Sequence, residues 1–262
     1  MFERIPYDAC PLCGGTSATL EGTFDCSKHP AYSVNLPNTI SWVKCDNCGH
    51  SFTDGYFDDA GMDEIGKVTH PHQRFSPLDY EKNRYITSRM VARVSNILHP
   101  EGEPRWLDIG FGNGSLILTA QEFGYKVTGL EFRQDAIEAL RPYISDVRAD
   151  NFLEMKEHGE FSVISMADVL EHVPYPKIFL EKSCELLSKG GALFISLPAF
   201  ESPVWNILSA GGNNPYWSEI EHFHNFSKER LSSFLKEFGF SVVDYHISER
   251  YRACMEITAI LL

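Results

Sequence analysis

A glycine-rich turn directly after a buried strand is the feature of this sequence that most constrains its fold. The apolar run Trp106–Ile109 contains Asp108, and glycines follow at positions 110, 112 and 114. Glycine is required where the backbone has φ > 0 or where a Cβ would block the approach of a ligand. A strand, such a turn and a helix in succession place free helix N–H groups at the carboxyl edge of a parallel sheet, where α/β proteins bind nucleotides. The spacing is Gly-x-Gly-x-Gly, so the dinucleotide fingerprint Gly-x-Gly-x-x-Gly is not met.

Strand and helix patterns alternate through the rest of the chain. Such alternation predicts a parallel sheet with helices on both faces. The chain ends in two strand patterns joined by a short polar turn, and such a hairpin requires that one strand runs antiparallel. The predicted strands span residues 105–109, 126–130, 145–149, 161–167, 192–197, 240–247 and 254–262.

Four of the seven cysteines form two Cys-x-x-Cys pairs, Cys10 with Cys13 and Cys45 with Cys48. A glycine follows each pair and permits the tight turn that points two thiolates at one ion. Four such sulfurs suit tetrahedral Zn²⁺, and a closed Cys₄ site predicts a structural role. Two alternatives are a catalytic zinc, which needs an open coordination position, and a pair of redox disulfides. The catalytic zinc is disfavoured by its need for an open position, and the redox disulfides are disfavoured because neither pair begins a helix in a βαβ unit.

These features together resemble a class I S-adenosylmethionine-dependent methyltransferase. The resemblance covers residues from about 80 to 262 and implies a Rossmann-like, seven-stranded, mostly parallel sheet with a reversed last strand. We therefore predict an α/β protein with a small N-terminal zinc-binding domain. The expected domains are a Cys₄ module over residues 1–60, a linker or flap over 61–79, and the methyltransferase domain over 80–262.

The same resemblance implies which residues hold S-adenosylmethionine. The glycine turn surrounds the methionine part, an acid after the second strand accepts both ribose hydroxyls, and an acid after the third strand accepts from the adenine amino group. Aromatic side chains near these acids are expected against the adenine face. The predicted cofactor-binding residues are Asp108, Gly110, Phe111, Gly112, Gly114, Glu131, Phe132, Asp150, Asn151, Phe152 and Asp168.

Three histidines are candidates for a general base, His172, His222 and His224, because histidine titrates near neutrality. The alternative for each is a structural one, in which the imidazole bonds a loop carbonyl. Asp168-x-x-Glu171-His172 with a downstream histidine, His224, also resembles the metal box of ubiquinone-pathway O-methyltransferases. There a divalent cation lowers the pKa of the attacked hydroxyl. In metal-free relatives, the same Glu-His pair packs against the cofactor loop.

Composition limits the partners. The 36 acids against 23 bases give a formal charge of −13, which disfavours a nucleic-acid substrate. No basic, apolar leader and no run of about 18 apolar residues is visible, so we expect a cytoplasmic protein without a membrane partner. The expected acceptor is a small hydroxylated molecule such as a sugar, a nucleotide-sugar or a polysaccharide precursor. A homodimer is compatible with the sequence. The alternatives are a protein or RNA acceptor read by the cysteine module, and a non-catalytic cofactor-binding protein.

Overall fold

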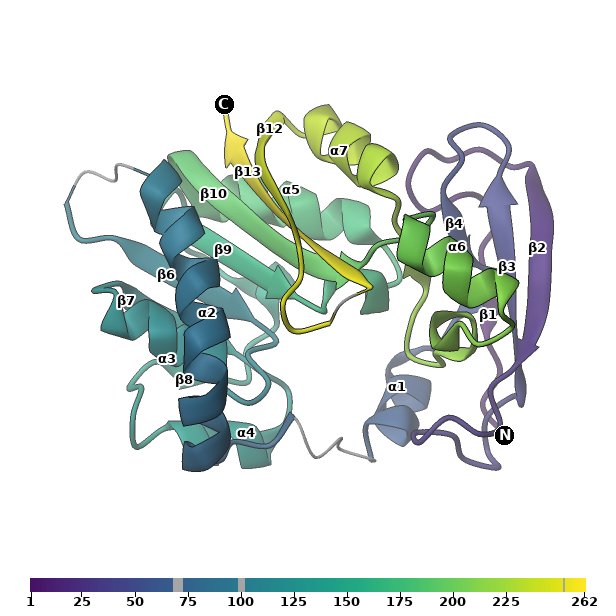
Figure 1. The fold of residues 1–262 in the computed structure, drawn as a ribbon, viewed down its shortest axis with the longest axis horizontal. Coiled ribbons are helices and arrows are strands. Elements are labelled where there is room, and N and C mark those ends of the chain that lie inside the picture. The colour runs from purple at the N-terminus through teal and green to yellow at the C-terminus, as the bar shows by residue number, and fades with distance from the viewer. Residues whose placement is uncertain (68–72, 99–101, 252) are drawn as a thin grey trace. The chain divides into compact units, whose positions relative to one another are not determined.

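The computed structural model describes residues 1–67, 73–98, 102–251 and 253–262, and the chain divides into two compact units (Figure 1). Unit 1 is made of Met1–Thr69, Leu170–Lys177 and Leu197–Phe234. Unit 2 is made of His70–Val169, Ile178–Ser196 and Leu235–Leu262. Each unit therefore contains segments that are far apart in the sequence.

Unit 2 is built on a seven-stranded mixed sheet with the order β12-β13-β10-β9-β6-β7-β8. The five strands from β10 to β8 are parallel, whereas β12 and β13 pair antiparallel, so one of these two opposes the other five. This result confirms the predicted Rossmann-like mixed sheet. The strands are β6 (Arg105–Ile109), β7 (Lys126–Leu130), β8 (Val147–Arg148), β9 (Phe161–Ala167), β10 (Leu187–Pro198), β12 (Phe240–Ile247) and β13 (Cys254–Leu261).

Helices cover both faces of this sheet; in Figure 1, α2 lies in front of it and α5 behind it. The α2 helix begins where the Ser76 hydroxyl accepts from the backbone N–H of Asp79, with Pro77 in the first turn. Its buried side chains, among them Met90 and Val94, pack with α3 and α4 in one apolar core. The helices are α2 (Pro77–Ile97), α3 (Ser115–Glu122), α4 (Gln134–Leu140), α5 (Pro176–Leu186) and α7 (Lys228–Glu237); α5 and α7 each begin in unit 1.

Unit 1 contains a four-stranded antiparallel sheet with the order β11-β4-β3-β2 and a separate antiparallel pair, β1 with β5. Its apolar core includes Trp42, Phe57 and Phe223, which come from distant parts of the chain. The elements are β1 (Ile5–Pro6), β2 (Ala18–Asp25), β3 (Thr39–Cys45), β4 (Ser51–Thr53), β5 (Gly55–Tyr56), β11 (His224–Asn225), α1 (Asp59–Gly66) and α6 (Pro203–Ala210), with short 3₁₀ helices at Leu170–His172 and Pro215–Ser218.

The linker and the fifth strand both differ from the expected secondary structure. Helix α1 falls partly within the predicted linker, whose residues 68–72 lie outside the described residues. The fifth strand begins at Leu187 rather than at Ala192, because Gly190 (φ +73°) and Gly191 lie in a register shift of β10 instead of following a helix. The domain boundaries at residues 60 and 80 remain predictions.

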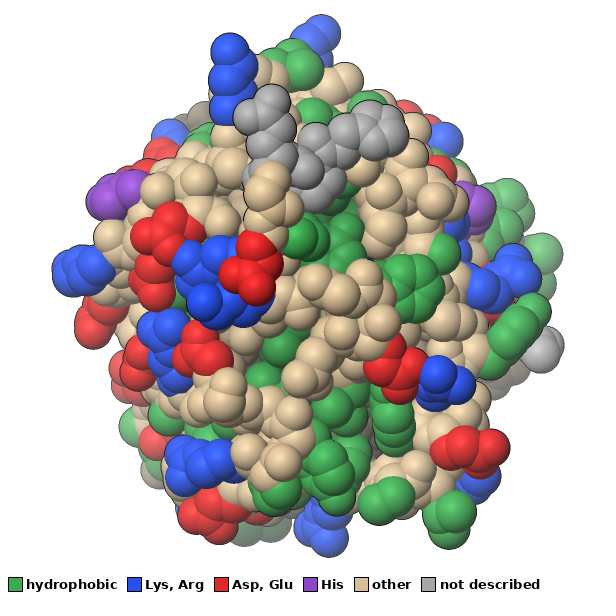
Figure 2. Space-filling view, turned by 90° about the vertical axis from the view of Figure 1, so that its left-hand side faces the viewer, with side chains coloured by type: hydrophobic (Ala, Val, Ile, Leu, Met, Phe, Trp, Pro, Cys, Tyr) green, Lys and Arg blue, Asp and Glu red, His purple; other side chains and the backbone are tan. Residues whose placement is uncertain are grey.

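Acidic and basic side chains are mixed on the surface. On the face in Figure 2, Lys and Arg lie among Asp and Glu. Arg148, for example, pairs with Asp146 at 2.6 Å and with Glu157 at 3.3 Å. None of the described helices combines the length and the apolar character that a bilayer crossing requires.

Candidate functional site

The glycine turn between β6 and α3 is tied to the end of β7. The Gly110 N–H donates to the Leu130 carbonyl (2.8 Å), and the Gly112 N–H donates to Glu131 Oε2 (3.0 Å). The three glycines have φ of +65°, +56° and +74°, a region that L side chains rarely adopt. A Cβ on Gly114 would also lie 2.6 Å from Leu140 Cδ1. This turn therefore requires glycine for both its conformation and its packing.

Glu131 follows β7, as predicted, and its carboxylate organises the turn. Oε1 accepts from the Arg133 N–H (3.0 Å), while Oε2 accepts from Gly112. Each carboxylate oxygen has two lone pairs, so these two bonds leave capacity for further donors. The carboxylate is thus held in place and can accept from a vicinal diol.

Asp108 is almost completely buried at the end of β6. Its Oδ1 accepts from the Ser165 hydroxyl (2.5 Å), and that hydroxyl oxygen accepts from the Trp106 indole N–H (2.8 Å). Burial raises the pKa of Asp108 to about 7, although the Ser165 hydrogen bond and the charge of Arg250 oppose that shift. The carboxyl therefore takes up a proton more readily than an exposed aspartate.

Asp168 lies after β9 with φ of +58°, and Arg250, from the turn between β12 and β13, meets its carboxylate at 2.5 Å. The backbone N–H of Asp168 donates to the Ser196 carbonyl at 2.8 Å. Nothing in the sequence pattern indicated Arg250, because an arginine in a polar hairpin turn is common.

The remaining predicted cofactor residues differ in exposure. Asp150 and Asn151 are exposed, and the Asn151 side chain accepts from the Leu153 N–H (3.1 Å). Phe152 is buried against Phe179, with ring centroids 5.3 Å apart. Phe111 is buried in the core of unit 2, whereas Phe132 is 79% exposed. Phe132 is thus the aromatic ring of this set that lies open to solvent.

His224 lies in β11 of unit 1 and is buried with both ring nitrogens hydrogen-bonded. Its Nδ1 is 3.0 Å from His50 Nε2, and its Nε2 donates to the carbonyls of Val173 (3.0 Å) and Pro174 (3.3 Å). Burial lowers the pKa of His224 to about 3. The general-base role of His224 stays a prediction, and this geometry favours the structural alternative.

Glu171, His172 and His222 converge in unit 1, with donor atoms within 4.8 Å of one another. The His172 Nδ1–H donates to the Glu221 carbonyl (3.1 Å), which leaves the lone pair on Nε2. His222 Nδ1 has no hydrogen-bond partner among the described residues, and burial lowers the pKa of His222 to about 3, which keeps the imidazole neutral. A carboxylate and two imidazoles form, when the imidazoles are neutral, a donor set for a divalent first-row cation. The downstream histidine of this group is His222, not the predicted His224, which lies outside it.

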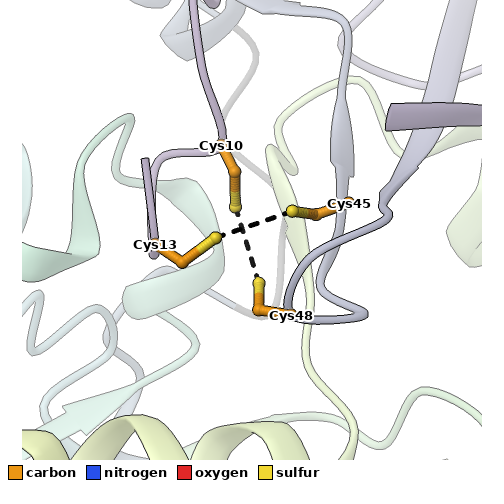
Figure 3. A group of neighbouring side chains, drawn as sticks. All are labelled: Cys10, Cys13, Cys45 and Cys48. Atoms are coloured by element: carbon orange, nitrogen blue, oxygen red, sulfur yellow. Dashed lines mark hydrogen bonds between the residues drawn. The ribbon is translucent and has the colours of Figure 1, made fainter. Parts of the chain in front are cut away.

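The four cysteine sulfurs of the two Cys-x-x-Cys pairs converge in unit 1 (Figure 3). The Cys10 and Cys48 sulfurs are 3.7 Å apart, and those of Cys13 and Cys45 are 3.6 Å apart. A tetrahedral zinc with Zn–S bonds of about 2.3 Å places its sulfurs about 3.8 Å apart. Burial raises the pKa of the Cys48 thiol to about 11, so a cation is needed to ionise it at neutral pH. The arrangement therefore fits a structural zinc.

Comparison with protein families identifies the class. Residues 70–245, more than half of the chain, match a family described as "Methyltransferase domain". The chain therefore belongs to this methyltransferase family, and the predicted class, S-adenosylmethionine-dependent methyltransferase, is confirmed.

Among curated proteins, the chain is similar to two proteins named ubiquinone biosynthesis O-methyltransferase. The one from Dechloromonas aromatica is 26% identical over 151 residues, which are 53% of this chain and 62% of that protein. The one from Xanthomonas axonopodis pv. citri is 32% identical over 111 residues, which are 39% of this chain and 46% of that protein. The chain thus spans less than two thirds of either relative.

Among solved structures, the chain is similar to S-adenosylmethionine-dependent methyltransferases from Archaeoglobus fulgidus and Thermotoga maritima. The first has a TM-score of 0.54 and 18% identity, and the match covers 68% of this chain and 94% of that chain. The second has a TM-score of 0.51 and 20% identity, and the match covers 70% of this chain and 95% of that chain. At these identities, the common feature is the fold.

Proposed function

We propose that this protein transfers the methyl group of S-adenosylmethionine to a hydroxyl oxygen of a small acceptor, assisted by a divalent cation at Glu171, His172 and His222. The convergence of these three donor groups within 4.8 Å carries the proposal. The names of the curated relatives support oxygen as the methylated atom.

The cofactor is assigned to the carboxyl edge of the sheet in unit 2. Glu131 accepts from the ribose hydroxyls with the lone pairs that Gly112 and Arg133 leave open. The glycine turn admits the methionine part, because no Cβ stands in its way. Phe132, which is exposed, is assigned to the adenine face, and Asp150 accepts from the adenine amino group.

The chemistry is an in-line displacement at the methyl carbon. The acceptor oxygen forms a bond to that carbon as the carbon–sulfur bond breaks, the sulfonium becomes a neutral thioether, and the hydroxyl proton passes to solvent. A divalent cation, when bound, lowers the pKa of a coordinated hydroxyl. The chain's own part is to orient the donors: the Glu221 carbonyl fixes the tautomer of His172, and burial keeps His222 neutral.

The acceptor class follows from this donor set. Three protein donors leave coordination positions open, and two adjacent hydroxyls of one acceptor can fill two of them. We therefore propose a small molecule with a vicinal diol, a group that sugars and catechols share. The cysteine centre is assigned a structural Zn²⁺ on the basis of its sulfur separations.

A histidine general base is the second candidate. His222 is favoured over His224 for this role, since both nitrogens of His224 are hydrogen-bonded whereas His222 Nδ1 has no partner in the described part of the chain. In that case the hydroxyl proton passes to His222, and turnover does not depend on a divalent cation.

The test is a methyl-transfer assay with a catechol and a vicinal-diol sugar, with and without added Mn²⁺, on samples whose zinc content is measured. We expect a mass gain of one methylene on the acceptor, dependent on Mn²⁺ and lost in Glu171→Gln, with Glu138→Gln on the exposed face of α4 as the control. Failure to bind S-adenosylmethionine at micromolar concentrations would overturn the proposal. Turnover that is independent of Mn²⁺ would contradict the role of the cation and favour His222 as the general base.

A further inference from the structure

His50 connects the cysteine centre to the rest of unit 1. It lies two residues after Cys48, and its carbonyl accepts from the Cys45 N–H (2.9 Å), which closes the turn that carries the second cysteine pair. The side chain is buried, with its ring against Phe226 at 4.8 Å and against His224 at 5.2 Å. The position of this ring is therefore set by the same turn that positions two of the four sulfurs.

In the chain of hydrogen bonds that starts at His50, each imidazole donates to the next acceptor. The Val173 carbonyl can only accept, so His224 Nε2 carries a hydrogen and donates to it (3.0 Å). His224 is neutral, so its Nδ1 has a lone pair and accepts from His50 Nε2–H (3.0 Å). Two successive bonds thus link the turn after Cys48 to the carbonyl of Val173, next to His172.

The backbone follows the same route. Strand β11 pairs with β4, His224 opposite Phe52. The Thr53 N–H donates to the Phe223 carbonyl (3.0 Å), and the Phe223 N–H donates to the Glu171 carbonyl (2.8 Å). The segments that carry Glu171 and His222 are therefore both attached to the sheet whose strand β3 ends at Cys45.

We propose that His50 is a positioning residue through which the cysteine centre holds Glu171, His172 and His222 in their metal-binding arrangement. His50 contributes no ligand to either centre; it fixes His224, and His224 fixes the segment that contains Glu171 and His172. The inference rests on the proposed divalent-cation site. Groups that hydrogen-bond a metal ligand directly change metal affinity by about 10- to 100-fold when they are removed. His50 acts through His224 and the backbone, so its expected effect is smaller.

The experiment is an electron paramagnetic resonance titration with Mn²⁺ on zinc-loaded full-length protein. His50→Phe keeps a ring but has no donor, whereas His50→Gln keeps an N–H donor of similar reach. We expect Mn²⁺ affinity to fall severalfold, up to about tenfold, in His50→Phe and to be largely restored in His50→Gln. His246→Phe is the control, because His246 is an exposed histidine on β12. Zinc content and the thermal unfolding midpoint are measured for each variant.

The outcomes separate the two proposals. Wild-type protein that binds no Mn²⁺ would overturn the divalent-cation site of the proposed function. Suppose that the wild type binds Mn²⁺ and that His50→Phe is folded, contains zinc and has the same Mn²⁺ affinity. This result would overturn the positioning role alone. If His50→Phe does not fold, His50→Met replaces it, since methionine matches glutamine in length but has no donor. Equal affinities of the Met and Gln variants would then overturn the role.

Discussion

Units 1 and 2 differ in the interactions that stabilise the interior of each. Unit 2 has a continuous apolar core that the helices α2, α3 and α4 share with the central strands, and its polar site residues lie in turns at strand ends. Unit 1 has a smaller core, and its short strands β4 and β11 are supplemented by four converging cysteines and by buried histidines. The comparison indicates that apolar burial stabilises unit 2, whereas converging cysteines and buried polar groups contribute more to unit 1.

The largest expected effect is the loss of the cysteine centre. Cys45→Ser removes one thiolate ligand, and a structural zinc contributes roughly 10 kcal/mol or more to the folding of a small zinc-binding peptide. We expect zinc to be lost and amide protection to fall across unit 1, while unit 2 retains protection and cofactor binding. Metal analysis and hydrogen exchange measure both. Cys184→Ser, outside the cluster, is the control. Equal loss of amide protection in both units would contradict the idea that only unit 1 depends on the cysteine cluster.

The apolar packing of unit 2 is tested at two glycines. Gly114→Ala introduces a Cβ at φ +74° that would lie 2.6 Å from Leu140 Cδ1, whereas Gly124→Ala, at φ +91°, meets no atom within 4 Å. We expect the free energy of unfolding in urea to fall by about 3 kcal/mol for Gly114→Ala and by about 1 kcal/mol for Gly124→Ala. Similar losses would mean that backbone strain, not packing, makes the turn sensitive.

A smaller effect is expected when the cofactor carboxylate is neutralised. Glu131→Gln keeps the shape of the side chain but removes the charge that strengthens its hydrogen bonds. We expect the affinity for S-adenosylmethionine, measured by calorimetry, to fall about tenfold with unchanged zinc content. Glu138→Gln, on the exposed face of α4, should leave the affinity unchanged. Unchanged affinity in Glu131→Gln would remove this residue from the cofactor site.

The last prediction concerns the pH dependence of unit 2. The pKa of Asp108 is raised from 3.8 to about 7, so its protonated form stabilises the folded state, and this contribution is lost as the pH rises through about 7. Asp108→Asn cannot ionise. We therefore expect the stability of the wild type, relative to Asp108→Asn, to decrease between about pH 4 and about pH 7, that is, from the pKa of the unfolded chain to that of the folded protein. Urea unfolding without cofactor checks this, and parallel pH profiles would contradict it.

Most of unit 2 was predictable from the sequence because its signals are local. The strands β6, β7, β9 and β12 begin and end at the predicted residues, since each is an apolar run bounded by polar residues or glycine. The third strand is shorter than expected, Val147–Arg148, because it pairs only at the edge of the sheet. Glu131 follows β7 and the three glycines follow β6, while their roles in cofactor binding stay a prediction.

In unit 1, only the cluster defined by the spacing of its cysteines could be predicted from the sequence. The two Cys-x-x-Cys pairs indicated the sulfur cluster, but the two residues of β11 carry no periodic pattern that would predict pairing with β4. His222 and His224 are two residues apart, a spacing that in an extended strand places both side chains on one face. His224 begins β11 and His222 precedes that strand. His222 therefore lies with Glu171 and His172, whereas His224 bonds His50.

The pairing of β4 with β11 has a consequence for the order of events during synthesis. His50 and His224 are separated by 174 positions, so the amino-terminal segment leaves the ribosome long before its hydrogen-bonding partner exists. Contacts of such high sequence separation form slowly and late. Until residue 225 emerges, β4 lacks its β11 partner, and an unpaired strand edge of this kind can pair with other chains.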